Sequence, residues 1–131
     1  MHFSEDDYED LKNRDVVLLS REGLCHMACK MIFDELGEGA PYVILREGIP
    51  NTYAHYFLKI DDKAVDMGGV FTMNEMLAFF PGDGPMIETS WRKLKEHREN
   101  VSEEEWEYVT DRFISHIQSN KQEWIRKIKG A

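Results

Sequence analysis

The chain has 131 residues, which suits a single domain spanning 1–131 and is long enough to bury a real hydrophobic core. Its 25 acidic residues against 16 Lys and Arg give a formal net charge of −9. This charge argues against nucleic acid or an anionic membrane as a partner, because both attract basic surfaces. With 42% hydrophobic residues the chain is not a disordered acidic tail, and no apolar run approaches the ~20 residues that span a bilayer.

The N-terminal third is predicted to be helical. Residues 5–13 form a candidate helix that Ser4 would cap, and the acidic residues at its start favour a helix N-terminus. No apolar stretch of a secretory signal is present there, so we expect a cytoplasmic protein with reduced cysteines. After a short apolar stretch of undecided type at 16–19, apolar residues recur at helical spacing over 24–36, and Gly37 predicts the end of this helix.

The middle third is predicted to form a small antiparallel sheet. Strands at 42–45 and 53–60 are separated by a turn signal that contains Gly and Pro. A tight connection at 61–63 leads into a third strand at 64–66, which the glycine pair 68–69 would end.

The last third returns to helices. A capping box at 72–75 starts a short helix that stops before the segment 81–85, which is rich in Pro and Gly. A last strand is expected at 86–89, and a second capping box at 102–105 opens a long helix with a basic end. This order of elements predicts an α+β fold.

Three residues form a candidate catalytic site. Cys25 starts the first well-defined helix, His55 lies within the strand 53–60, and Asp66 ends the next strand. A helix N-terminus favours a thiolate, an imidazole can take the thiol proton, and a carboxylate behind the imidazole fixes its orientation. The hairpin places His55 opposite roughly 67–68, so with one residue of slack His55 and Asp66 can share a face of neighbouring strands.

The order and context of this trio resemble the transglutaminase-like and papain-like cysteine superfamily. Residues 21–28 resemble the nucleophile helix of that group, and also the Arg-Gly-Gly-x-Cys segment of arylamine N-acetyltransferases, with Glu22 where that motif has Gly. Residues 55–69 resemble the portion that carries the His strand, the hairpin and an Asp-Gly element. The resemblance covers about residues 21–70. It implies a nucleophile helix packed on a small antiparallel sheet, with a long C-terminal helix after it.

The resemblance also implies a role for each residue of the trio. Cys25 would be the nucleophile, His55 the base and Asp66 the residue that orients it. The implied function is a small cysteine hydrolase or acyltransferase. It would act on an amide, isopeptide or thioester bond of a peptide or protein-derived substrate, through an acyl-thiol intermediate and without a cofactor.

Other residues are candidates for the oxyanion hole and the substrate groove. Residues 16–22 contain neither Gln nor Asn, so an oxyanion hole would use backbone amides or a residue such as Asn51. Tyr53 and Tyr56 either line a substrate groove beside His55 or pack within the sheet.

The alternative function is a non-enzymatic interaction module, such as an adaptor, inhibitor or immunity-type protein, that keeps this fold and binds a protein partner. The excess of acidic residues and the long capped C-terminal helix motivate it.

The trio also has simpler interpretations. Cys25 could be a buried helix thiol, His55 a half-buried histidine and Asp66 a turn former. Cys29, one turn after Cys25, is expected in the core, with a resolving or metal-binding thiol as its alternative. The two cysteines with His26 or His55 could bind zinc, but no second ligand pair at suitable spacing exists, so no metal is expected.

The remaining conspicuous side chains are assigned structural or solvated roles. His26 points about 100° away from Cys25 on a helix, so we expect it at the surface. The other histidines, His2, His97 and His116, are expected to be solvated. The apolar residues at helical spacing are expected in the core rather than in a ligand stripe: Trp106, Phe113 and Trp124. Residues 103–105 are read as helix-start charge and not as a metal site.

Overall fold

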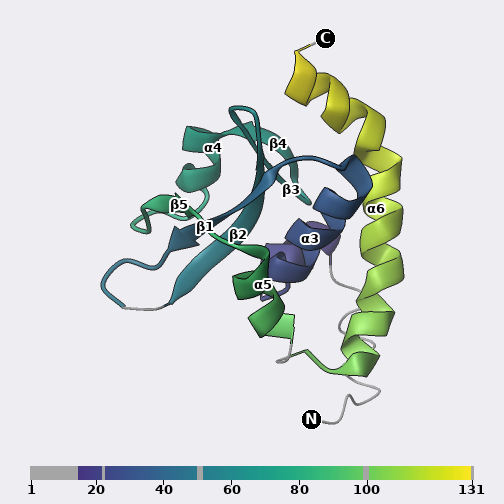
Figure 1. Cartoon of the computed structure of the whole chain (residues 1–131), viewed down its shortest axis with the longest axis horizontal. Helices are drawn as coiled ribbons and strands as arrows, with labels where there is room; N and C mark the ends of the chain where they lie inside the picture. The colour runs from purple at the N-terminus through teal and green to yellow at the C-terminus, as the bar shows by residue number, and fades with distance from the viewer. Residues whose placement is uncertain (1–14, 22, 50–51, 99–100, 131) are drawn as a thin grey trace.

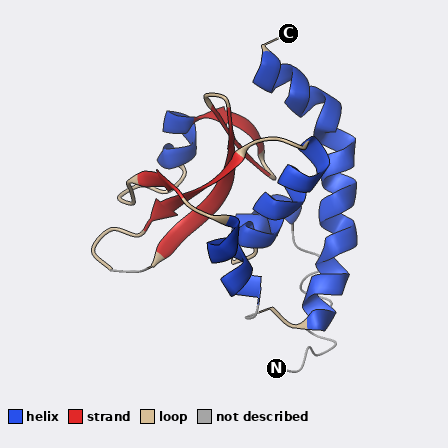
Figure 2. Cartoon of the chain, viewed as in Figure 1, coloured by secondary structure: helices blue, strands red, loops and turns tan. Residues whose placement is uncertain are grey.

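A five-stranded antiparallel sheet of order β4-β3-β2-β1-β5 forms the centre of the computed structural model, which describes residues 15–21, 23–49, 52–98 and 101–130 (Figures 1 and 2). The strands are β1 (Ala40–Leu45), β2 (Tyr53–Ile60), β3 (Lys63–Asp66), β4 (Gly69–Thr72) and β5 (Met86–Glu88). The helices are α2 (Val16–Arg21), α3 (Cys25–Leu36), α4 (Met73–Ala78), α5 (Trp91–Arg98) and α6 (Glu103–Lys129). The α+β class predicted from the sequence is therefore confirmed.

The sheet separates two apolar layers. Figure 1 shows α3, α5 and α6 grouped on one side of the sheet and α4 on the other. Because successive strand residues face opposite sides, Tyr56 and Leu58 of β2 join the layer under α3 and α6, while Phe57 joins Met76 of α4 in the second layer. Phe113 of α6 lies in the first layer and is fully buried. The central strand β2 is thus covered on both faces.

Several predicted boundaries agree with the structure. The helix expected over 24–36 is α3, and Gly37 follows it in the left-handed conformation. Both predicted capping boxes lie at helix starts, where the Thr72 and Ser102 hydroxyls accept backbone N–H groups of the first turn of α4 and α6. The short stretch at 16–19 is part of a helix, α2. The candidate helix at 5–13 and its cap Ser4 lie outside the described residues.

The sequence prediction missed two elements. Gly68 and Gly69 were expected only to end a strand, but Met67 and Gly68 form a tight turn from β3 into the antiparallel strand β4, where Asp66 pairs with Gly69. Gly69 has a φ of +131°, which favours glycine at this turn. Helix α5 was not predicted because only two of its residues, Trp91 and Leu94, are large and apolar.

The described residues contain no helix that combines the length and the hydropathy needed to cross a membrane.

Candidate functional site

His55 and Asp66 are brought together by the hairpin between β2 and β3. The register pairs Leu58 with Val65, which makes His55 and Asp66 diagonal neighbours on one face of the sheet. His55 Nε2 lies 3.1 Å from Asp66 Oδ2. A carboxylate can only accept, so Nε2 carries the proton and donates it, and Nδ1 of a neutral imidazole is left with a free lone pair. The contact expected from the hairpin register is present.

Asp66 is also bound by Arg21, a residue to which the sequence analysis gave no role in the site. Arg21 Nε donates to Oδ2 at 2.9 Å and Nη2 donates to Oδ1 at 3.2 Å, and the Gly68 N–H donates to Oδ1 at 2.8 Å. Burial by itself raises the pKa of Asp66, but the hydrogen bonds from His55 and Arg21 outweigh burial and hold the pKa below its usual 3.8. Asp66 is therefore an ionised carboxylate, although it is only 3% exposed.

The free nitrogen of His55 lies in an apolar environment. The side chain is 1% exposed, and Nδ1 has no hydrogen-bond partner among the described residues. The Phe80 ring, which follows α4, stacks on the imidazole with centroids 4.8 Å apart and an interplanar angle of 20°. A buried lone pair without a hydrogen-bond donor costs free energy, and a buried group of this kind in a folded protein is often kept for a function.

Cys25 lies at the first position of α3 and is buried. The pKa of its thiol is raised to about 11, chiefly by burial and to a smaller extent by the charge of Asp66. The backbone N–H groups of Tyr56, His26 and Cys25 itself act against this by favouring the thiolate. Burial prevails, so Cys25 is a protonated thiol at neutral pH.

The Cys25 thiol of α3 and the His55 imidazole of β2 are not paired. Within the described part of the chain, Cys25 shares no hydrogen bond with His55, whose Nδ1 has no partner. The sulfur instead contacts the backbone N–H of Tyr56, the residue directly after His55. The His55 ring stacks against Phe57 and Phe80 on the α4 face of the sheet, while Cys25 belongs to the layer under α3. The structure thus joins His55 and Asp66 on one face of the sheet and places Cys25 on the other face, next to the backbone of Tyr56.

The groove candidates pack against α5. Tyr56 is buried, its hydroxyl lies 2.8 Å from Nε2 of His97, and its ring centroid is 4.6 Å from that of Tyr53. Burial raises the pKa of Tyr56 to about 12 and also raises that of Tyr53. Packing is therefore the observed environment of both tyrosines. Asn51 lies outside the described residues.

The expectation that the histidines are solvated is wrong for His26 and needs correction for two others. His26 is only 3% exposed, because α5 covers it and brings the His97 ring to 5.7 Å. His97 is half-buried against Tyr56, as described above. His116 is also half-buried, with Nε2 2.6 Å from the Met67 carbonyl oxygen. His2 lies outside the described residues.

The remaining predictions concern the core and metals. Cys29 is a free thiol, 2% exposed, and burial raises its pKa well above 9.0. Phe113 and Trp124 are buried as expected, whereas Trp106 is half-buried. Across the described ranges, three or more His, Cys, Asp or Glu side chains never gather in a group that could hold a metal ion.

Comparison with known proteins gave no match among protein-family models, curated proteins or solved structures. The resemblance to papain-like and transglutaminase-like enzymes therefore stays a prediction.

Proposed function

We propose that the chain is a small cysteine hydrolase or acyltransferase of the papain-like and transglutaminase-like kind, acting on an amide, isopeptide or thioester bond. One observation carries the proposal. Asp66 binds Nε2 of His55 and leaves the buried Nδ1 without a partner among the described residues, and the backbone N–H of the next residue, Tyr56, favours the Cys25 thiolate. A base that is oriented on one side and open on the other is one part of the arrangement that nucleophilic catalysis requires, and Cys25, across β2 from the imidazole, is the nucleophile that we assign to it.

The raised pKa of Cys25 decides how the thiol would be activated. A thiol with a pKa of about 11 is not a preformed thiolate, so its proton must leave while the new bond forms. His55 Nδ1 takes this proton as the sulfur bonds to the carbonyl carbon, and Asp66 stabilises the resulting imidazolium. The backbone N–H groups at the start of α3 face the developing oxyanion.

The second half of the reaction returns the proton. The bond to the leaving group breaks, His55 donates its proton to the departing amine or thiol, and an acyl group remains on Cys25. Water or an amine then attacks this acyl-thiol, with His55 taking the proton of the attacking group. The bond between the acyl carbon and the Cys25 sulfur breaks, the acyl group leaves on the water oxygen or the amine, and His55 returns its proton to the sulfur. Because the His55 ring faces α4 and Cys25 lies under α3, the thiol and Nδ1 must first come to the same side of β2 before this proton transfer.

A non-enzymatic interaction module is the second candidate, and a different observation favours it. Cys25 is 1% exposed and has no hydrogen bond to His55 in the described structure. A thiol in this position would be a core residue, and the His55–Asp66 contact would be a structural one.

Acylation by p-nitrophenyl acetate distinguishes the two candidates. The enzyme is expected to release a burst of p-nitrophenolate that approaches one equivalent, and peptide mapping should find the acetyl group on Cys25. Cys25→Ala should abolish the burst, and His55→Gln should slow it by about 100-fold or more, the usual size of general-base assistance. Cys29→Ala is the matched control, because it removes a second buried thiol of the same helix and should leave the burst unchanged.

The interaction module predicts a different result in the same assay. A burst that survives in Cys25→Ala, or a wild-type chain that is folded by circular dichroism and never acylated on Cys25, would reject the catalytic function.

A further inference from the structure

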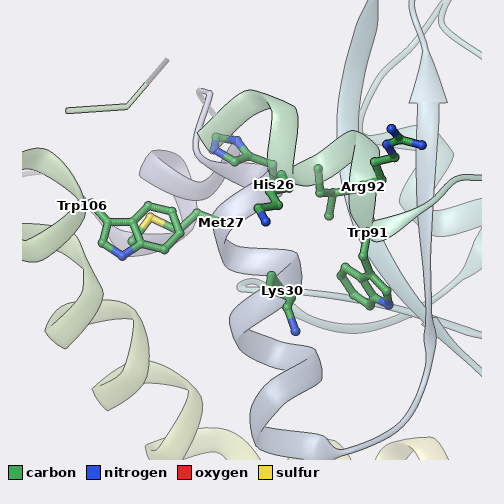
Figure 3. Close-up of a pocket in the computed structure, with 8 residues that line it drawn as sticks. His26, Met27, Lys30, Trp91, Arg92 and Trp106 are labelled. Atoms are coloured by element: carbon green, nitrogen blue, oxygen red, sulfur yellow. The ribbon is translucent and has the colours of Figure 1, made fainter. Parts of the chain in front are cut away.

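A groove lies between α3, α5 and the start of α6, with a volume of about 440 Å³ (Figure 3). Its lining comes from all three helices: His26, Met27 and Lys30 of α3, Trp91, Arg92, Leu94 and Lys95 of α5, and Trp106 of α6. We refer to these eight residues as the α5 groove. Its volume lies within the range of ordinary ligand pockets and would hold one or two large side chains.

The floor and walls of the α5 groove are apolar. Met27 and Leu94 are buried beneath it, while Trp91 and Trp106 are half-buried and flank it from α5 and α6 (Figure 3). Trp91 is held in place by Phe33, with ring centroids 4.7 Å apart. Aromatic side chains at the edge of an open groove offer a large contact area at a low entropic cost, as they do in the anchor pockets of protein interfaces.

The rim of the α5 groove is basic, in a chain whose net charge is −9. Lys30, Arg92 and Lys95 line it, and no acidic residue does. Lys30 is partly neutralised by Asp34, with Nζ 2.7 Å from Oδ1. Arg92 and Lys95 are exposed and form no ion pair with any other described residue. Within the described ranges, two cations without an ion pair therefore lie beside two tryptophans and are available to a ligand.

The α5 groove is separate from the candidate catalytic site. Cys25 and Cys29 belong to the buried layer between α3 and the sheet, whereas Lys30 is exposed on the other side of the helix. The groove would exist in the same form in an enzyme or in an interaction module, so the inference below does not depend on the proposed function.

We propose that the α5 groove binds an acidic segment of a partner protein, which inserts a large apolar side chain between α5 and α6 and places carboxylates on Arg92 and Lys95. Charge complementarity selects this occupant, because the cations are unpaired and the lining carries no acid. The apolar floor requires an anchor that a simple anion lacks. Nucleic acid fits the cations and aromatic rings, but the net charge of the molecule repels it.

Fluorescence anisotropy with designed peptides tests this inference. The probe is a fluorescein-labelled peptide in which Leu and Phe are flanked by Asp and Glu on both sides. Its two controls carry Lys at the acidic positions or Ala at the two apolar positions. Saturable binding is expected for the probe alone, and it should weaken as salt is added, because exposed charges are screened.

Charge reversals on α5 locate the binding. Arg92→Glu and Lys95→Glu should each weaken binding of the probe by about tenfold, since each replaces an attraction with a repulsion. Lys93→Glu is the matched control, because Lys93 is exposed on the same helix, undergoes the same charge change and does not line the groove. It should alter the affinity less than about twofold, in line with a surface charge remote from the contact.

Several results would overturn the proposal. Absence of saturable binding of the acidic probe is one, and equal losses in Arg92→Glu and Lys93→Glu are another. Tighter binding of the Lys-containing peptide, or of a single-stranded oligonucleotide, would assign the groove to another class of partner.

Discussion

At the scale of single residues, Asp66 organises the candidate site. It accepts hydrogen bonds from His55, Arg21 and the Gly68 N–H, and these donors keep its charge stable in a buried position. A Cβ at position 68 would lie 2.7 Å from Arg21 Nη2 and 3.0 Å from Asp66 Oδ1, so a larger residue there would displace the guanidinium that binds Asp66. The carboxylate therefore holds α2 and β2 to the same corner of the sheet.

Replacing this carboxylate should destabilise the chain. Asp66→Asn leaves Arg21 and His55 without their charged partner, and we expect a loss of about 2–4 kcal/mol in the free energy of unfolding at pH 7, measured by urea titration. Asp34→Asn is the control, because Asp34 forms an exposed pair with Lys30 that should contribute about 0.5 kcal/mol or less. Equal losses in the two variants would contradict the assigned role.

The stability that Asp66 contributes should also depend on pH in a defined direction. The folded-state pKa of Asp66 lies below 3.8, so the stability it contributes is fully present above that value and is lost as the pH falls through the folded-state pKa. The difference in unfolding free energy between wild type and Asp66→Asn should be constant from pH 7 to about pH 5 and should shrink below about pH 4. A difference that grows on acidification would contradict this.

The thiol of Cys25 gives a third prediction. With its pKa raised from 9.0 to about 11, the thiolate fraction at pH 8 falls by about 100-fold relative to an ordinary thiol. Iodoacetamide should therefore modify Cys25 in the folded chain at least about 100-fold more slowly than in the urea-unfolded chain, as followed by mass spectrometry of its peptide. Modification at the unfolded rate would instead indicate an exposed thiol of ordinary pKa.

The sequence predicts some of these residues and not others, for physical reasons. The contact between His55 and Asp66 follows from a two-strand register, which local sequence determines. The ion pair of Arg21 with Asp66 joins residues 45 positions apart and depends on where α2 packs. The burial of His26 depends on α5, so it could not be inferred before that helix was known.

At the scale of elements, the sequence predicted those helices that have capping residues at their starts or glycine or basic residues at their ends. The long helix α6 begins at the Ser102 cap and ends with three cations in its last turn. Helix α5 has a buried Leu94 and a half-buried Trp91, and its other residues are polar, so no apolar periodicity marks it. Strand β4 was not predicted because it begins at the second of two consecutive glycines, and such a pair predicts a turn more readily than a new strand.

The cap of α6 can be tested directly. The Ser102 hydroxyl accepts the Glu105 N–H at 3.1 Å, and Ser102→Ala removes this acceptor. We expect the unfolding free energy to fall by about 1 kcal/mol, and Ser102→Asp to retain most of it, because Asp caps helices as well as Ser does. A loss in Ser102→Asp as large as that in Ser102→Ala would show that the cap does not stabilise α6.

At the scale of the whole molecule, the charge is unevenly distributed. Acidic residues occupy the first turn of α6, where they complement the helix dipole, whereas α5 presents Arg92, Lys93 and Lys95 to solvent. The net charge of −9 thus coexists with a local basic surface. This contrast shows that the net charge does not describe the surface that a partner of α5 would meet.

The two apolar layers also raise the question of whether the chain unfolds as one domain. All three tryptophans, Trp91, Trp106 and Trp124, lie on helices of the first layer, whereas Met76 is fully buried in the second. Since β2 contributes to both layers, we expect a single cooperative transition.

Met76→Ala should lower the unfolding free energy by about 2–5 kcal/mol. Tryptophan fluorescence and far-ultraviolet circular dichroism should report the same lowered urea midpoint. If the fluorescence midpoint stayed at its wild-type value while the dichroism midpoint fell, the layers would unfold independently and the single-domain assignment of residues 1–131 would be wrong.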